Sequence, residues 1–233
     1  MSEAIMPKSD EDIHEFLDGD LTILQKKRGC RVSQESVLLA GSVATLKGAA
    51  AVDLGTGCGI LPLLLARTSS IPHFTGIEFQ PELVDLARRN VRLNDYEERI
   101  EIVNEDIRRV QRSFEPAAFD LVIANPPFRR LHAGRYSSDS SRRDSLYEVQ
   151  MELPDLVAAA RYLLRYKGTA AVVYGVERLA ELVSALQAGD LEPKYLVFIH
   201  HHRECRASAV IVHARLSAKP GLEVGPPITL NAS

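Results

Sequence analysis

The chain has 233 residues, of which 45% are hydrophobic and 25% are charged, and its net charge is −3 at pH 7. These values are typical of one globular domain, or of one domain with a small appendage. The net charge excludes a strongly basic protein that binds nucleic acid over its whole surface. No apolar run reaches the length of a membrane span. The acidic first 20 residues lack the layout of a signal peptide, which predicts a flexible start over 1–20 and a cytoplasmic location.

The predicted elements alternate between short apolar strands and helices. An extended arm or hairpin over 21–32 precedes a helix over 34–46, for which Ser33 is the expected N-cap. Residues 21–233 are expected to form a single domain, made of an arm and helix (21–46) and a core (47–233). The core elements are expected as strand 50–54, helix 61–68, strand 74–78, helix 81–93, strands 100–104 and 119–124, helix 146–165, strand 169–174, helix 177–187, and strands 195–200 and 207–214.

Strands that alternate with helices form a mostly parallel sheet with helices on both faces. The last two predicted strands follow each other without a helix between them, so we expect them to form an antiparallel pair at one edge. The sequence therefore predicts an α/β, Rossmann-like fold with a seven-stranded sheet and an extended C-terminal tail.

A glycine-rich turn follows the first core strand. Asp53 stands at the strand tip, and Gly55, Gly57 and Gly59 follow it with G-x-G-x-G spacing. The glycines allow a tight turn and the close approach of a ligand to the backbone. A dinucleotide site has G-x-G-x-x-G spacing, and a carboxylate at this tip would repel a pyrophosphate but can bind the ammonium of a methionine moiety. Alone, the pattern is equally consistent with a tight turn that binds nothing.

Two further acidic residues follow the next two strands. Glu78 can accept both hydroxyls of a ribose, as acids at this position do in NAD enzymes. Asp106 can accept an adenine amine while Ile107 covers the ring, although Asp106 alone would be interpreted as a turn cap. Because all three segments lie at carboxyl ends of strands, together they predict S-adenosylmethionine as the cofactor. The predicted cofactor-binding residues are Asp53, Gly55, Thr56, Gly57, Gly59, Glu78, Phe79, Asp106, Ile107 and Asn125.

The segment Asn125-Pro126-Pro127-Phe128 ends the fourth core strand, whose tip is expected beside that of the first strand. As a structural feature it is simply a good strand terminator. The Asn125 side-chain oxygen and the Pro126 carbonyl can also accept the two hydrogens of an exocyclic amine, with the carbonyl preorganised by the prolines. Phe128 offers a face on which a planar base can stack. These four residues are predicted to be catalytic in an amine methyltransferase.

Basic residues are clustered on this chain. One cluster over 129–143 follows the Asn-Pro-Pro-Phe segment directly, which favours a loop that contacts phosphates. No metal is predicted, since Cys30, Cys58 and Cys205 lack metal-ligand spacing and consecutive histidines at 200–202 would alternate between strand faces. The predicted RNA-binding residues are Lys26, Lys27, Arg28 and Arg31 in the arm, and Arg129, Arg130, Arg135, Arg142 and Arg143 after the motif.

The motifs at 53–59 and 125–128 resemble those of amino-methyltransferases that modify adenine, cytosine or glutamine nitrogen. The arm and first helix (25–40), Glu192-Pro193-Lys194 with the following His200…Arg203, and the tail over 221–224 are similar to the bacterial tRNA1(Val) adenine-N6-methyltransferase family. The resemblance covers residues 20–230. It implies the class I methyltransferase fold, S-adenosylmethionine as cofactor, and a target adenine beside a tRNA anticodon.

One departure from that family keeps other targets open. The family usually has Tyr at the position of Phe128, and ribosomal-RNA adenine methyltransferases also carry Asn-Pro-Pro-Phe. The alternatives are an rRNA adenine-N6 or guanine-N2 methyltransferase, a protein glutamine N5-methyltransferase, or a silent RNA-binding scaffold. Only about 20 residues precede the arm, which argues against the glutamine enzymes with their N-terminal helical domain. We expect an RNA partner, above all tRNA, no membrane association, and a monomer or homodimer.

Overall fold

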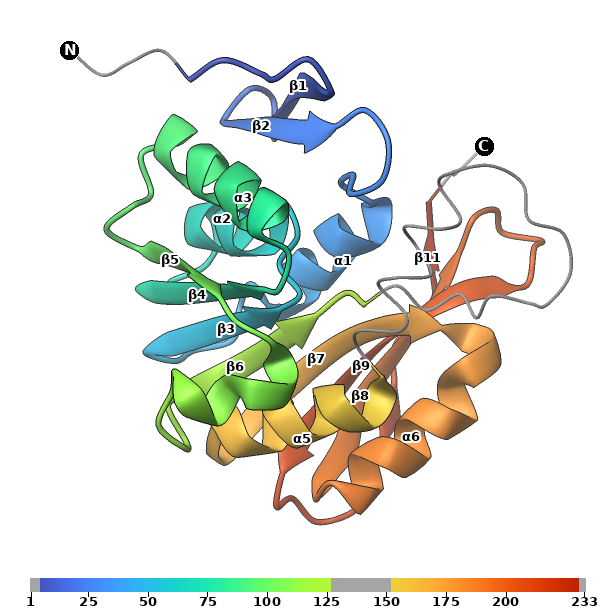
Figure 1. Cartoon of the computed structure of the whole chain (residues 1–233). Coiled ribbons are helices and arrows are strands. Elements are labelled where there is room, and N and C mark those ends of the chain that lie inside the picture. Colours follow the sequence, from blue (N-terminus) through green and yellow to red (C-terminus); the bar gives the residue numbers. More distant parts are fainter. Residues whose placement is uncertain (1–4, 127–151, 231–233) are drawn as a thin grey trace, which may run out of the picture.

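A β-sheet runs through the centre of the structure, and helices cover both of its faces (Figure 1). The computed structural model describes residues 5–126 and 152–230. The strands of the sheet are β3 (Ala50–Leu54), β4 (His73–Glu78), β5 (Ile100–Asn104), β6 (Phe119–Ala124), β7 (Leu164–Gly175), β8 (Leu191–His200), β9 (Ala207–Leu216), β10 (Glu223–Val224) and β11 (Ile228–Thr229). The helices are α1 (Gln34–Val43), α2 (Ile60–Thr68), α3 (Pro81–Leu93), α5 (Leu153–Leu163) and α6 (Leu179–Ala188), with short 3-10 helices η1 (Ile107–Arg112) and η2 (Val176–Arg178).

The strand order across the sheet is β10-β8-β9-β7-β6-β3-β4-β5, and β11 also pairs with β8. Strands β3 to β7 pair in parallel, whereas β9 is antiparallel to both of its neighbours, β7 and β8. The predicted Rossmann-like α/β fold is therefore confirmed. The sheet has nine strands instead of the seven predicted, because the tail adds two-residue strands along the edge of β8. An edge strand has unpaired backbone groups, so even a short extended segment can pair with it.

Two hydrophobic clusters lie on opposite faces of the sheet. One packs beneath α1, α2 and α3, and the other beneath α5 and α6. The run Leu121–Ala124 shows how one strand supplies both: Leu121 and Ile123 join the first cluster, while Val122 and Ala124 join the second. A parallel strand that is buried on both faces needs such a continuous apolar run, and this explains why the core strands were predictable.

A separate antiparallel hairpin precedes the sheet. It consists of β1 (Glu11–Phe16) and β2 (Leu21–Lys26), and it lies over α3 on the side away from the sheet (Figure 1). The expectation of a flexible start over 1–20 is thus wrong for β1. Most β1 side chains are at least partly exposed. Its sequence therefore lacks the alternation of apolar and polar residues that would have predicted a strand. Backbone pairing with β2 and one buried ion pair hold it in place.

That ion pair joins Glu11 of β1 to Arg89 of α3. Two guanidinium nitrogens of Arg89 donate to the two carboxylate oxygens of Glu11 at 2.8 and 2.5 Å, and the Glu11 side chain is fully buried. Burial by itself would raise the pKa of Glu11, but the hydrogen bonds from Arg89 and the Lys8 backbone, with the charges of Arg89 and Lys26, lower it overall. The hairpin is therefore attached through a carboxylate that must stay ionised.

Replacing Glu11 with Gln is expected to lower the free energy of unfolding by about 3 kcal/mol at pH 7, because Arg89 loses its buried partner and keeps only the more exposed Asp85. A lowered folded-state pKa contributes stability above the unfolded-state pKa of Glu, and this contribution disappears as the pH falls through the folded-state pKa. Urea denaturation at pH 7 and at pH 4 measures both effects, and the difference from the parent should shrink at pH 4.

Asp12→Asn on the same strand is the matched control. The Asp12 side chain is 40% exposed and its contacts with Lys27 and Arg31 are 4.0 Å long, so its loss should change stability by less than about 0.5 kcal/mol. Equal effects of the two substitutions would show that the Glu11–Arg89 pair does not hold the hairpin.

Candidate active site at the carboxyl edge of the sheet

The predicted cofactor and catalytic segments meet at one edge of the sheet. Strands β3, β4, β5 and β6 are parallel, so their carboxyl ends share this edge. Asp53 of β3 is in register with Ile123 of β6. Asn125 follows Ile123 by two residues and comes directly after the end of β6. Glu78 of β4 is in register with Asn104 of β5. Open α/β sheets bind ligands at such an edge.

Asp53 is a buried carboxylate without a hydrogen-bond partner among the described residues. Its relative exposure is 1%, and both of its carboxylate oxygens are buried and unpaired. Burial raises the pKa of Asp53 to about 7; the neighbouring Thr56 hydroxyl opposes this increase, and the charge of Glu78 adds to it. A buried polar group without a partner costs free energy, which a cationic ligand group would offset. This carboxylate fits the ammonium of a methionine moiety.

The turn after Asp53 is shaped by three glycines with left-handed backbone. The φ angles of Gly55, Gly57 and Gly59 are 77°, 58° and 83°. The amides of Gly55 and Thr56 donate to the Ile77 carbonyl at 2.9 and 3.0 Å, which anchors the turn to β4. The added Cβ of a residue larger than glycine at position 57 would lie 2.8 Å from the Cys30 sulfur.

Gly57→Ala is expected to weaken cofactor binding by about 10-fold or more. The left-handed backbone costs about 1–2 kcal/mol for a residue with a Cβ, and displacement of the arm at Cys30 adds to this. Gly29→Ala is the control, since Gly29 has φ 95° but nothing within 4 Å of the added Cβ. Calorimetry with S-adenosylhomocysteine measures both variants. Equal affinities would show that close packing at Gly57 does not shape the cofactor turn.

Glu78 is joined to the same turn. One of its carboxylate oxygens accepts the amide of Gly57 at 3.0 Å, and the other accepts the amide of Gln80 at 2.9 Å. The side chain is buried, and this burial raises the pKa of Glu78. Each oxygen has a second lone pair, so the carboxylate can still accept two ribose hydroxyls.

Two of the predicted adenine contacts have structural roles of their own. Asp106 caps η1 by accepting the Arg108 amide at 2.9 Å, and it forms an ion pair with the Arg108 guanidinium at 2.6 Å. Ile107 is 5% exposed and belongs to the core beneath α5. Phe79, by contrast, is 46% exposed at the end of β4. The exposed ring of Phe79 is the apolar surface available to an adenine here.

Two asparagines that the sequence did not single out hold the site together. Asn104 donates to the carbonyls of Glu78 and Phe79, both at 2.9 Å, and so fixes the turn after β4. Asn90 of α3 is fully buried and donates to the carbonyls of Leu24 and Cys58, both at 2.8 Å. It therefore links the hairpin to the glycine turn. Both asparagines act on backbone that is distant in sequence, and no local pattern reports such contacts.

Asn125 contacts the first helix through its side-chain nitrogen. Its Nδ2 donates to the Ser36 hydroxyl at 2.7 Å and to the Ser33 hydroxyl at 3.2 Å. Ser33 also accepts the Ser36 amide at 3.2 Å, which confirms it as the N-cap of α1. Pro126 is buried beside Asn125, whereas Pro127 and Phe128 lie outside the described residues.

The predicted RNA-binding residues of the arm differ in their exposure and in their contacts with the rest of the protein. Lys26 is 15% exposed on its side chain and is 2.9 Å from Asp10. Lys27 donates to the Ser9 carbonyl at 2.9 Å, and Arg31 donates to the Lys27 carbonyl at 3.3 Å. Arg28 is exposed. The other predicted residues lie outside the described part of the chain: Arg129, Arg130, Arg135, Arg142 and Arg143.

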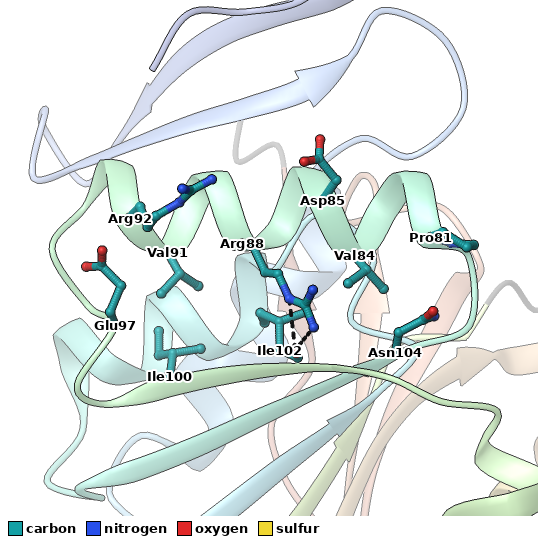
Figure 2. Close-up of a pocket in the computed structure, with 10 residues that line it drawn as sticks. All are labelled: Pro81, Val84, Asp85, Arg88, Val91, Arg92, Glu97, Ile100, Ile102 and Asn104. Carbon is teal, nitrogen blue, oxygen red and sulfur yellow. Dashed lines mark hydrogen bonds between the residues drawn. The ribbon is translucent and has the colours of Figure 1, made fainter. Parts of the chain in front are cut away.

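A hollow of about 480 Å³ lies between α3 and β5 (Figure 2). Arg88 reaches from α3 to β5, where it donates twice to the Ile102 carbonyl at 3.1 and 2.8 Å. This contact satisfies one carbonyl of the edge strand. None of the ten residues that line the hollow was predicted to bind the cofactor, although one of them, Asn104, also holds the turn after Glu78.

Residues 30–177 match the family model described as "Methyltransferase small domain". The chain belongs to this methyltransferase family. A relative from Tolumonas auensis, named "tRNA1(Val) (adenine(37)-N6)-methyltransferase", is 32% identical over 178 residues, which cover 76% of this chain and 72% of the relative. A relative of the same name from Porphyromonas gingivalis W83 is 30% identical over 180 residues, which cover 73% and 68% of the two chains. The protein is therefore a methyltransferase, as the motifs predicted.

Solved structures agree with the fold of this methyltransferase family. A "predicted O-methyltransferase" from Agrobacterium tumefaciens superposes with a TM-score of 0.67 at 22% identity, over 84% of this chain and 86% of its own. A "SAM dependent methyltransferase" from Aquifex aeolicus gives a TM-score of 0.57 at 12% identity, over 78% and 89%. Within residues 5–126 and 152–230, no helix is long and apolar enough to cross a membrane.

Proposed function

We propose that this methyltransferase transfers a methyl group from S-adenosylmethionine to the N6 amine of an adenine in RNA, in particular an adenine next to a tRNA anticodon. The observation that carries the proposal is Asn125 at the tip of β6, beside the unpaired carboxylate of Asp53 on β3. The two relatives named as tRNA1(Val) adenine methyltransferases support the choice of adenine and tRNA.

The residues present fit the proposed cofactor. Asp53 would hold the ammonium, the glycine turn would lie against the methionine moiety, and Glu78 would accept the ribose hydroxyls. Phe79 would cover the adenine ring. Asp106 can accept the adenine amine only if Arg108 gives up part of its ion pair. The cofactor, when bound, supplies an electrophilic methyl group.

The residues of this chain then orient the nucleophile. The exocyclic amine of adenine is a weak nucleophile because its lone pair is delocalised into the ring. The Asn125 oxygen and the Pro126 carbonyl would accept its two hydrogens, which pyramidalises the nitrogen and directs its lone pair toward the methyl. Rate enhancement comes from in-line positioning and from preorganised acceptors, and the product proton leaves to water.

An adenine inside a base stack cannot reach this edge of the sheet, so we expect the target base to be flipped out of its strand. Phe128 is proposed to stack on the flipped base, and the basic residues over 129–143 to contact the RNA backbone. Within the arm, Arg28 and Lys27 are better placed for RNA than Lys26, which is held by Asp10. A cytoplasmic location and a monomeric or homodimeric state stay predictions.

The proposal is tested by incubating the protein with isotopically labelled S-adenosylmethionine and total RNA from cells that lack the enzyme. Digestion to nucleosides then identifies the methylated product by chromatography and mass spectrometry. We expect labelled N6-methyladenosine in the tRNA fraction. Label in ribosomal RNA, or in N2-methylguanosine, would overturn the tRNA target or the adenine assignment respectively.

A further inference from the structure

Within the described part of the chain, the side-chain amide of Asn125 is bound at its nitrogen end. Its nitrogen donates to the hydroxyls of Ser36 and Ser33, which come from the first turn of α1, 89 and 92 residues away in sequence. Ser36 is 5% exposed, so water does not readily replace it as the acceptor. Among residues 5–126 and 152–230, no group donates a hydrogen bond to the Asn125 oxygen, which is the atom that the proposed function needs as acceptor for the adenine amine.

We infer that Ser33 and Ser36 are positioning residues that hold the Asn125 amide with its oxygen available to the substrate amine. The inference rests on the proposed function. An amide rotates about its last side-chain torsion between two orientations that exchange nitrogen and oxygen. In the wrong orientation, the Asn125 nitrogen would face the substrate amine, and two donors would meet without an acceptor.

The two serines are not equivalent. Ser33 accepts the Ser36 amide as the N-cap of α1, so its loss also weakens the helix. Ser36 lies in the first turn of the helix and does not cap it, although its hydroxyl contacts the Ser33 hydroxyl at 3.3 Å. Its contact with Asn125 is the shorter of the two at 2.7 Å. Ser36 is therefore the cleaner position at which to separate positioning from stability.

The first experiment compares kcat of the Ser36→Ala and Ser42→Ala variants. Ser42 lies on the same helix, but its hydroxyl donates to the Leu39 carbonyl and contacts His213, 171 residues away, instead of Asn125. Ser36→Ala is expected to lower kcat on a tRNA anticodon-loop transcript on the order of 10-fold, from loss of one orienting hydrogen bond. KM for RNA, the Kd of S-adenosylhomocysteine and the thermal unfolding midpoint should stay close to the parent values. Ser42→Ala should leave kcat unchanged.

A double-mutant cycle with Asn125→Asp makes the test specific. A carboxylate has an acceptor at both ends, so it needs no serine to choose its orientation. Ser36→Ala should therefore lower kcat in the parent and leave it unchanged in the Asn125→Asp background. Ser36→Thr, which keeps the hydroxyl, should recover at least part of the lost activity.

Three results would overturn the inference: an unchanged kcat for Ser36→Ala, an equal loss in the Asn125→Asp background, or a loss that tracks only the unfolding midpoint. The proposed function is tested separately, by identifying the nucleoside that the parent protein methylates. If that nucleoside is not N6-methyladenosine, the ratio of Ser36→Ala to parent on the amine that is methylated still decides the positioning role.

Discussion

Asn125→Ala is expected to lower kcat on RNA about 10²–10³-fold, as the loss of one preorganised polar contact does in other active sites. The substitution removes the proposed acceptor for the substrate amine at the tip of β6. It leaves Asp53, the glycine turn and Glu78 in place, because these residues are held by β3 and β4. Steady-state kinetics with saturating cofactor measure kcat, and calorimetry with S-adenosylhomocysteine should give an affinity within a few-fold of the parent.

Ser42→Ala serves as the reference for a change that leaves the reacting groups intact. If Asn125→Ala loses cofactor affinity and activity to the same extent, Asn125 acts in cofactor binding and the acceptor role is wrong. If kcat is unchanged, another group holds the amine.

Asp53→Asn is expected to weaken the binding of S-adenosylhomocysteine about 10²-fold, because a buried charge pair loses one partner. In the absence of cofactor, the same substitution should stabilise the folded protein. The raised pKa of Asp53, about 7, means that the folded state favours the protonated carboxyl, so this group's contribution to stability is lost as the pH rises from about 4 to 7. At pH 8 the Asn variant should therefore unfold at a higher temperature than the parent when no cofactor is present.

The same pKa predicts the pH dependence of cofactor affinity. Only ionised Asp53 pairs with an ammonium, so the Kd of the parent should rise about tenfold for each pH unit below 7. The Asn variant should show no such dependence between pH 5.5 and 7. A parallel pH dependence in both proteins would assign the titration to another group and contradict the role of Asp53.

The sequence was sufficient to predict the seven longer strands of the sheet and the residues at its carboxyl edge. Asp53, Glu78 and Asn125 lie at the carboxyl ends of β3, β4 and β6, which are neighbours in the sheet, and parallel pairing brings such strand ends together whatever the details of packing. The glycine spacing predicted a tight turn, and Gly55, Gly57 and Gly59 have the positive φ angles that such a turn uses. These inferences depend on strand order and on local backbone, both of which leave clear patterns in the sequence.

The missed features depend on contacts between distant segments. Ser36 meets Asn125 only because α1 packs next to the tip of β6, and β1 is held by an ion pair between residues 78 positions apart. The strands of the tail have two residues each, too few for any alternation to appear. Asp106 has the capping role in η1 that its position alone indicated, and its contact with an adenine stays a prediction.

The proposed target is tested by two tRNA transcripts that differ only in the nucleotide 3′ of the anticodon, adenine in one and guanine in the other. Each is incubated with the parent protein and labelled S-adenosylmethionine, then digested to nucleosides. We predict N6-methyladenosine from the adenine transcript and no product from the guanine transcript. Equal methylation of both would contradict the anticodon-loop target, and methylguanosine as the product would contradict the adenine chemistry assigned to Asn125.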